Sequence, residues 1–572
     1  MSQKILNSKI KHFLLVGLFL AAVFVSAVVV WRAPALFKGY TAYTVSPNAL
    51  IARNLYLVDS FSIENDLNVL LSSNLVEEEG HLSRFGNKLT SFSYAEVFKF
   101  TGFPSESRFL LLSVIIHALT LLIFTIVVLY LFNIKTALIF SLIYVFIPFN
   151  WQLPYYFGNY EFALFFSSLF FLFYFLGTNE NKNYFYLVIS GVFLALAGLS
   201  KETFLLIVPF LFFYLLFYKK KLALTYILIP FVIIFAVFWL PSATENTNIK
   251  LLFTETSEET KSSDFASYGH LFPDPYTYHF KFDEFIGNIQ NQIENNELDL
   301  SSEVYFKKNM SNLAFGRINP FDRLMVGTMM LSKHISKFFS LEGIGGAFVF
   351  LLILIGGAAI RRKNKDLYYF IFYWIISSIL IFSYAVLVSR SHLMDFGWAL
   401  SLLITLGILS LSEAIANYFG LKGKKLIVVY AVIVMLVSYN FVLVGHVVWN
   451  NIYDHNTNLV IKSYAQEIEK MNISDEDIIA VNLNPSEINN LNYMTDKSLI
   501  SFQEKTVEDL LEENKLNEAF EKFGVKYILG YSDELNKKIT NYSDVISIAS
   551  NSIEPIEIEV SANKGWLMNL VK

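Results

Sequence analysis

Two basic residues, Lys201 and Arg390, lie in short polar joints between long apolar runs of the sequence. Lys201 belongs to the joint 200–203, together with Glu202, and His392 follows Arg390 by two positions. A lysine binds phosphate as a point charge, and an arginine can bind it through two parallel hydrogen bonds. These residues could therefore hold a phosphate group at the ends of the apolar segments. Alternatively, each is a charged side chain at a helix end that reaches the polar surface of a membrane.

Other ionisable residues also gather at the ends of apolar runs. Glu161 opens one run, Asp395 and His392 open another, and His117 lies about two turns into a third. The centres of the runs are almost free of charge. An ion-coupled transporter usually carries ionisable groups near the middle of the membrane. The distribution therefore ranks a lipid or solute transporter last among the functions considered.

The composition indicates a membrane protein with many spans. The chain has 572 residues, of which 54% are hydrophobic, and a mean hydropathy of +0.47. A soluble chain of this length would carry far more charge. The sequence contains no cysteine, which excludes disulfides, thiolate metal sites and cysteine nucleophiles. It has no basic stripe for nucleic acid, and the scattered histidines form no metal-binding pattern.

The apolar runs predict eleven membrane helices, because each run is long enough, or nearly so, to cross a hydrocarbon core of about 30 Å. The runs lie at 13–31, 109–132, 136–149, 160–177, 184–199, 203–218, 222–240, 344–360, 367–389, 393–417 and 425–448. Three polar regions remain, at 32–108, 241–343 and 449–572. The long polar region 241–343 is typical of a lid or binding element.

The basic residues of the short loops predict the orientation, since cytoplasmic loops carry an excess of Lys and Arg. With a cytoplasmic N-terminus, only Lys201 and Arg390 fall in short outer loops. The inner segments then hold Lys4, Lys9, Lys11, Lys135, Lys182, Lys219, Lys220, Lys221, Arg361, Arg362, Lys363, Lys365, Lys422, Lys424 and Lys425. This orientation places all three large polar regions outside the cytoplasm.

The C-terminal region 449–572 reads as a small extracytoplasmic α/β domain that follows a transmembrane domain at 1–448. Its segments 458–471 and 506–523 fit amphipathic helices, and 477–483 and 525–531 fit buried strands. Helices that alternate with apolar strands are typical of an α/β fold.

Several segments, in order, resemble those of the GT-C superfamily of membrane glycosyltransferases, in particular the protein O-mannosyltransferase and aminoarabinose-transferase branch. IARNLYLVDSFS resembles the "ARNL" segment of the first external loop, and GVFLALAGLSKETFLLIVPF resembles the "GLA.LTK" segment. SRSHLMDFGWALSLL and FEKFGVKYILG resemble the "R…P.LALL" and "GVKYVL" segments. The resemblance covers most of the chain except 241–343.

The resemblance implies a hexosyl- or pentosyltransferase that takes a sugar from a polyprenyl-phosphate carrier at the outer leaflet. The acceptor would be a lipid, a glycan or a protein. A cation must hold the leaving phosphate, and a carboxylate should take the proton of the acceptor. Lys88 falls near the family's lysine, and Lys201 and Arg390 lie at the matching depth. His392 joins this predicted substrate-binding set, in which Glu202 either orients Lys201 or neutralises it.

The sequence departs from the family at its acidic residues. The stretch from Trp31 to Val58, where the family has its first acid, contains no Asp or Glu. The displaced candidates for the catalytic carboxylate are Asp59, Glu64 and Asp66; alternatively, these belong to a solvated acidic loop. Glu64 and Asp66 would face one side of an extended segment, so a divalent metal is an open option. Glu161 matches a family glutamate and is assigned to substrate binding, although it could instead be a simple charge at a helix N-terminus.

Two further readings stay open. One, motivated by the missing first-loop acids, is a catalytically degenerate relative that binds lipid or partners through its outer domains. The other is a polysaccharide ligase or polymerase, which also has many helices and a large external loop but less often carries a terminal α/β domain.

Overall fold

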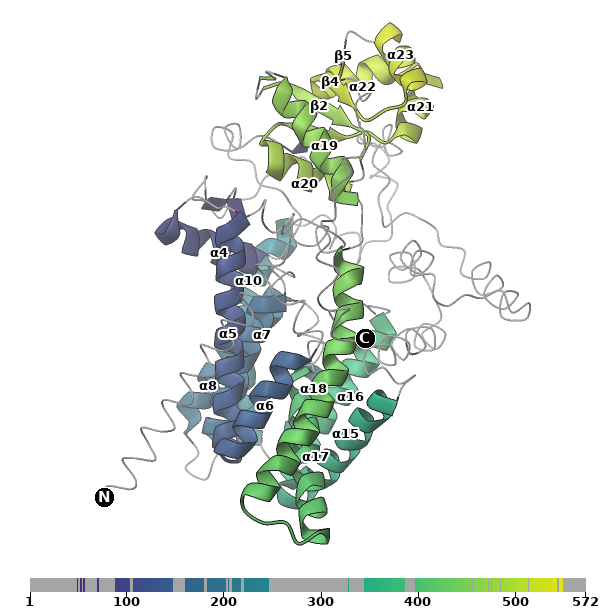
Figure 1. Ribbon diagram of the computed structural model, residues 1–572. Helices are drawn as coiled ribbons and strands as arrows, with labels where there is room; N and C mark the ends of the chain where they lie inside the picture. Colours follow the sequence, from purple (N-terminus) through teal and green to yellow (C-terminus); the bar gives the residue numbers. More distant parts are fainter. Residues whose placement is uncertain are drawn as a thin grey trace, which may run out of the picture.

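A computed structural model describes most of the helical core and the C-terminal region. The described residues are 49, 52–53, 55–56, 69–70, 88–102, 106–147, 160–178, 183–201, 204, 208–217, 221–245, 328, 344–385, 397–453, 457–471, 473–474, 476–483, 485–512, 514–542 and 545–548. They form a bundle of long helices with a smaller α/β unit at one end, which we call the tail (Figure 1). We call the two ends of the bundle the tail-side end and the far end.

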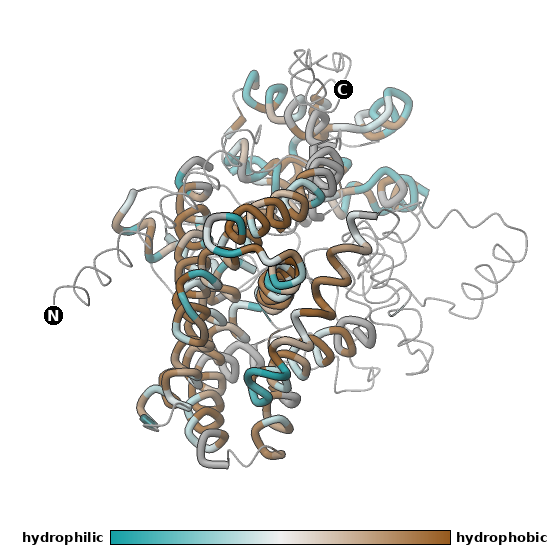
Figure 2. The backbone as a smooth tube through the Cα atoms, turned by 60° about the horizontal axis from the view of Figure 1, so that its bottom comes forward, coloured by the Kyte–Doolittle hydropathy of each residue, from teal (hydrophilic) through white to brown (hydrophobic). Residues whose placement is uncertain are grey.

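Ten of the eleven predicted apolar runs coincide with helices of the bundle, and the run 13–31 lies outside the described residues. The helices are α5 (Glu106–Leu131), α6 (Ile134–Phe146), α7 (Tyr160–Thr178), α8 (Tyr184–Ser200), α9 (Val208–Phe217), α10 (Lys221–Glu245), α15 (Ile344–Lys363), α16 (Lys365–Ala385), α17 (Gly397–Tyr418) and α18 (Lys424–Tyr453). A further helix, α4 (Lys88–Thr101), lies at the tail-side end (Figure 1). Apolar residues make up most of the length of the bundle helices (Figure 2).

Within the described part of the chain, five helical segments have the length and apolar composition to cross a membrane. They are Leu111–Leu131, Tyr160–Thr178, Gly345–Lys363, Gly397–Tyr418 and Lys425–Val442. Three shorter apolar segments, Ile134–Phe146, Tyr184–Ser200 and Leu224–Val237, accompany them. The count of eleven membrane helices therefore stays a prediction.

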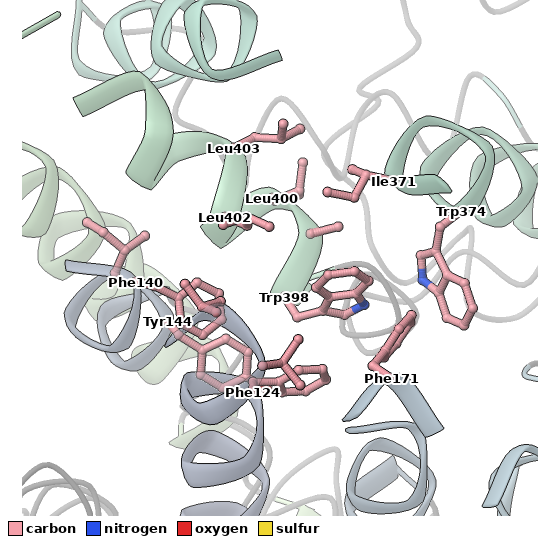
Figure 3. Close-up of a cluster of buried hydrophobic side chains, with 14 of the residues drawn as sticks. Phe124, Phe140, Tyr144, Phe171, Ile371, Trp374, Trp398, Leu400, Leu402 and Leu403 are labelled. Atoms are coloured by element: carbon pink, nitrogen blue, oxygen red, sulfur yellow. The ribbon is translucent and has the colours of Figure 1, made fainter. Parts of the chain in front are cut away.

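Large aromatic side chains fill the centre of the bundle. Trp398 of α17 is 2% exposed and stacks on Phe124 of α5, with ring centroids 5.7 Å apart. On its other side lie Phe171 of α7, at 4.3 Å, and Trp374 of α16, at 6.4 Å (Figure 3). Aromatic rings bury large apolar areas and pack in tilted and offset arrangements. This cluster joins four helices into one core.

Close approach of two helices depends on two glycines. A Cβ added at Gly356 of α15 would collide with the backbone carbonyl of Leu403 in α17, and one added at Gly407 with that of Leu352 in α15. Small residues allow membrane helices to pack backbone against backbone. α15 and α17 are therefore locked together at a short distance.

The tail is built on a five-stranded sheet with the strand order β1-β3-β2-β4-β5, whose edge strand β1 (Val69–Leu70) comes from the first polar region of the chain. Strands β2 (Ile478–Val481), β3 (Leu499–Ser501), β4 (Val525–Leu529) and β5 (Ile546–Ile548) are parallel. Around them lie the helices α19 (Thr457–Lys470), α20 (Pro485–Thr495), α21 (Glu504–Glu512), α22 (Leu516–Phe523) and α23 (Asp533–Tyr542). Parallel strands need crossover connections of this kind, which here are helical.

The predicted helix at 506–523 is wrong in one respect, because the structure breaks it into α21 and α22. Asn514 between them has a φ of 59°, a left-handed conformation that a continuous helix cannot contain. Asn tolerates this conformation better than most residues.

The last bundle helix, α18, continues past the predicted domain boundary at 448–449 and ends at Tyr453.

Candidate active site

Glu161 lies buried in the first turn of α7, at the tail-side end of the bundle, with 2% of the residue exposed. Two hydroxyl groups from other helices donate hydrogen bonds to its carboxylate. Tyr94 Oη of α4 donates to Oε2 at 2.7 Å, and Ser113 Oγ of α5 donates to Oε1. Three helices thus fix the direction of one buried carboxylate.

Tyr94 is itself held in place by aromatic neighbours. Its ring lies 5.1 Å from that of Phe162 and 5.5 Å from that of Phe109, both edge-on, and none of the residue is exposed. Burial, followed by the charge and the hydrogen bond of Glu161, raises the pKa of the Tyr94 hydroxyl well above its ordinary value. The hydroxyl therefore stays protonated and remains a hydrogen-bond donor to Glu161.

Lys201 is the C-cap residue of helix α8, and its side chain lies near the start of α7. Its backbone is extended, with φ −152° and ψ 119°, and its N–H still donates to the carbonyl of Ala197. The Nζ atom lies 5.3 Å from the ring centroid of Tyr160, the residue that precedes Glu161. A cation at this distance is attracted by the face of the ring. Of the predicted site residues, the structure thus brings Lys201 and Glu161 into one neighbourhood.

Three more polar atoms are buried on the same helices. Oγ1 of Thr90, Nδ1 of His117 and Oγ of Ser200 accept or donate no hydrogen bond within the described part of the chain. Thr90 lies one turn before Tyr94, His117 lies one turn after Ser113, and Ser200 precedes Lys201. Buried polar atoms usually have a partner, since leaving one unpaired costs about 1–3 kcal/mol. These three atoms lie on the helices that carry Tyr94 and Ser113 and on the helix that Lys201 caps.

The remaining predicted site residues have different outcomes. Lys88 is the first residue of α4, the helix that carries Tyr94. Six others lie outside the described residues: Asp59, Glu64, Asp66, Glu202, Arg390 and His392. Among the residues that are described, no group of three His, Asp or Glu side chains could hold a metal ion. The predicted acids of the first loop and the open question of a divalent metal therefore stay predictions.

Sequence reasoning missed Tyr94 and Ser113. A signal was nevertheless present, because Thr90 with Tyr94 and Ser113 with His117 are pairs spaced by four residues. Residues spaced by four share one face of a helix. Polar pairs with this spacing inside otherwise apolar or aromatic helices point to a shared polar face.

Comparison with known proteins rests on the fold. No family model matches the sequence, and no curated protein matches it either. Among solved structures, the chain is similar to the archaeal oligosaccharyltransferase AglB from Archaeoglobus fulgidus, in complex with an inhibitory peptide and a dolichol-phosphate. That alignment has a TM-score of 0.54 and 12% identity, and it covers 91% of this chain and 69% of AglB.

A second similar structure is ArnT from Cupriavidus metallidurans bound to undecaprenyl phosphate. The alignment has a TM-score of 0.51 and 12% identity, and it covers 94% of this chain and 89% of ArnT. The apo form of ArnT gives the same TM-score of 0.51. Both AglB and ArnT are membrane glycosyltransferases of the GT-C superfamily. The chain shares the fold of these two proteins.

Proposed function

We propose that this protein transfers a sugar from a polyprenyl-phosphate carrier to a lipid, glycan or protein acceptor at the outer face of a cell membrane. The observation that carries the proposal is the buried carboxylate of Glu161, fixed by two hydroxyl donors, with Lys201 over the ring of the preceding residue Tyr160, within a GT-C fold. The solved structures of AglB and ArnT contain dolichol-phosphate and undecaprenyl phosphate, respectively. A carrier of the same chemical class fits the cation at the tail-side end.

In the proposed reaction the anomeric carbon of the sugar loses its bond to the carrier phosphate and gains a bond to an acceptor hydroxyl or amine. Negative charge builds up on the leaving phosphate, so a fixed cation lowers the barrier. We assign this role to Lys201, assisted by Lys88 and Arg390. The acceptor must also lose a proton, which requires a base.

Substrate orientation and proton transfer are divided between Glu161 and the acids of the first loop. Glu161 is a buried carboxylate whose direction is fixed by the Tyr94 and Ser113 hydroxyls, and a carboxylate held in this way is a strong acceptor for a hydroxyl group of the sugar or the acceptor. We therefore assign it to substrate binding and orientation. The proton acceptor is proposed among Asp59, Glu64 and Asp66 of the first loop, with a divalent metal at Glu64 and Asp66 as an option to be tested.

The proposal includes the predicted membrane arrangement. Eleven spans with a cytoplasmic N-terminus would place Glu161, Lys201 and the tail on the outer side. Support comes from the strong excess of basic residues at the opposite helix ends. In this arrangement the phosphate of a lipid carrier reaches Lys201 at the surface of the outer leaflet.

The decisive experiment offers the purified protein in lipid a panel of polyprenyl-phosphate sugars, with native membrane extract as the source of acceptors. Mass spectrometry would detect released polyprenyl phosphate and glycosylated product. We expect one donor to be consumed by the wild type and by a Lys135→Ala variant at the far end. A Lys201→Ala variant should turn the donor over at least about tenfold more slowly. Equal turnover of the two variants would exclude Lys201 as the phosphate ligand.

A second candidate function, a catalytically degenerate relative that binds lipid or a partner, is favoured by the absence of acids between Trp31 and Val58. The triple variant Asp59→Ala, Glu64→Ala, Asp66→Ala discriminates between the two. Loss of turnover with normal folding supports the enzyme, while unchanged product rules out all three as the base. Lipid binding without any turnover supports the degenerate relative. Sugar polymers as products would indicate a polymerase instead.

A further inference from the structure

A buried arginine links the first polar region of the chain (32–108), called here the first external region, to the tail. Arg53 is 3% exposed and forms an ion pair with Asp496, with 3.1 Å between Nη1 and Oδ1. Its other nitrogen, Nη2, donates to Oδ1 of Asn492 at 3.2 Å. Asn492 belongs to α20, and Asp496 follows the same helix directly. The planar guanidinium therefore holds both the end of α20 and the turn that leads into β3.

A second link lies close to the first. Strand β1 (Val69–Leu70) pairs antiparallel with β3, so that Val69 faces Ile500 and Leu70 faces Leu499. The ion pair at Asp496 and the start of the β1–β3 pairing at Leu499 are only three residues apart in the tail. Two separate points of the first external region are thus attached to one short segment of the tail.

The residues around Arg53 also touch the candidate active site. Ala49 and Ala52 are fully buried in a cluster with Tyr94. Like Arg53, they lie in helical backbone. Tyr94 in turn donates to Glu161. A continuous set of contacts therefore runs from Asp496 through Arg53 and its helical neighbours to the carboxylate.

Open α/β sheets usually bind ligands at the switch point, which in the tail sheet lies at the carboxyl ends of β2 and β4. There Nδ2 of Asn482 donates to the carbonyl of Gly530 at 3.0 Å, and its Oδ1 accepts from the N–H of Glu504 at 3.0 Å. Tyr531 Oη donates to the carbonyl of Phe502 at 2.6 Å. The protein's own groups thus bridge this edge of the sheet within the described residues, which favours a mechanical role for the tail.

We propose that Arg53 is a positioning residue, through which the tail sets the placement of Tyr94 and Glu161. The inference rests on the proposed function only for its effect on turnover; the mechanical link itself can be measured separately. As a positioning residue, Arg53 acts through the contacts of Ala49 and Ala52 and does not touch the donor. Its loss should therefore lower the rate of sugar transfer in the enzyme–donor complex more than it lowers the affinity for the donor.

The mechanical link is tested by hydrogen–deuterium exchange, which needs no substrate. In an Arg53→Ala variant, peptides covering residues 49–56 and α4 should exchange at least about tenfold faster than in the wild type. The control is Lys526→Ala, which removes the ion pair between Lys526 and Asp477 within the tail. Unchanged exchange in the Arg53 variant would overturn the proposal. The milder Asp496→Asn variant gives the same test if Arg53→Ala does not fold, and Asn suits the φ of 52° at this position.

Turnover distinguishes positioning from direct contact with the substrate. For both Arg53→Ala and Asp496→Asn we expect kcat to fall about tenfold, with the donor KM changed less than about twofold. An effect of Arg53→Ala without any effect of Asp496→Asn would mean that Arg53 binds the substrate directly, and would refute the positioning role.

An engineered disulfide provides a rescue experiment, because the chain has no cysteine of its own. Cysteines at Val69 and Ile500, which are paired across β1 and β3, should form a disulfide that holds the first region on the tail. Introduced into the Arg53→Ala variant, the oxidised pair should restore most of kcat and slow the exchange, and reduction should reverse both. Failure to restore either one contradicts the proposal. If the wild type itself turns over no donor, the proposed function fails, and the exchange measurements alone decide the positioning role.

Discussion

Each end of the helical bundle holds a glutamate beside a tyrosine, but the two pairs differ in burial. At the tail-side end, Glu161 is 2% exposed and accepts hydrogen bonds from Tyr94 and Ser113. At the far end, 55% of the Glu413 side chain is exposed, and Glu413 lies 3.7 Å from Lys135 and 3.4 Å from Tyr430 Oη. The residue types are alike, while the surroundings are not.

The difference in burial decides what each pair can do. An exposed ion pair is screened by water and contributes about 0–1 kcal/mol. A buried carboxylate with directed donors keeps its orientation, and it interacts strongly with a ligand because water does not weaken the field. The tail-side pair is therefore suited to binding and orienting a ligand. The far-end pair is suited to attaching α6 to α17 and α18.

The largest expected effect comes from Glu161→Gln, which removes the charge but keeps the shape. The amide nitrogen cannot accept a hydrogen bond, so one of the two hydroxyl donors loses its acceptor. We expect sugar transfer to fall about 100-fold or more. The matched change Glu413→Gln should leave transfer within about twofold. Product formation by mass spectrometry measures both, and equal losses would remove the distinction between the two ends.

The next effect is that of Tyr94→Phe, which deletes one donor to the buried carboxylate. A hydrogen bond to a charged group contributes about 1.5–3 kcal/mol, so we expect transfer to fall about tenfold. The same substitution at the far end, Tyr430→Phe, should have little effect on transfer. Initial rates at saturating donor measure this difference; a normal rate for Tyr94→Phe would show that Ser113 alone suffices to orient Glu161.

The pH dependence of stability sharpens the comparison further. Burial first, and then the charge and hydrogen bond of Glu161, raise the pKa of Tyr94, so the folded protein holds this proton more tightly than the unfolded chain. The stabilisation is complete below the ordinary tyrosine pKa of about 10 and is lost as the pH rises through the folded value. Above pH 10, the melting temperature should therefore fall less steeply with rising pH in Tyr94→Phe than in the wild type. Tyr531 in the tail, whose pKa burial also raises, contributes equally to both proteins and cancels. Identical slopes of melting temperature against pH in the two proteins would contradict the raised pKa of Tyr94.

The smallest effect is expected at the far end. Lys135→Ala removes the cation 3.7 Å above the ring of Tyr430 and 3.7 Å from Glu413. Because Lys135 and Glu413 are both partly exposed, the free energy of unfolding should change by less than about 1 kcal/mol, and less still in high salt. Melting curves at two salt concentrations measure this. If Lys135→Ala lowered the free energy of unfolding as much as Tyr94→Phe does, the far end would be as important for the fold as the tail-side end.

The sequence predicted what depends on local pattern. Ten apolar runs became helices because the length and polarity of a segment largely decide whether it forms an apolar helix. The strands at Ile478–Val481 and Val525–Leu529 were predicted for the same reason. Glu161 and Lys201 stood out as charges at the ends of apolar runs.

The remainder depended on contacts between distant segments. The two-residue strand β1 has no local signal, since its pairing comes entirely from β3. The partners of Glu161 come from α4 and α5, and only packing brings their hydroxyls to the carboxylate. The break at Asn514 was missed because the helical periodicity of 506–523 masks a single left-handed residue.

The link between Arg53 and Asn492 joins residues 439 positions apart, which has a consequence for how the protein is made. Synthesis proceeds from the N-terminus, so Arg53 and β1 exist long before their partners in α20 and β3 have been translated. Contacts so distant in sequence form late and slowly. Until then, the edge of β1 stays unpaired and open to incorrect pairing. A C-terminal truncation would therefore leave Arg53 and β1 without their partners, and should send nascent protein to aggregation or degradation even if every bundle helix forms correctly.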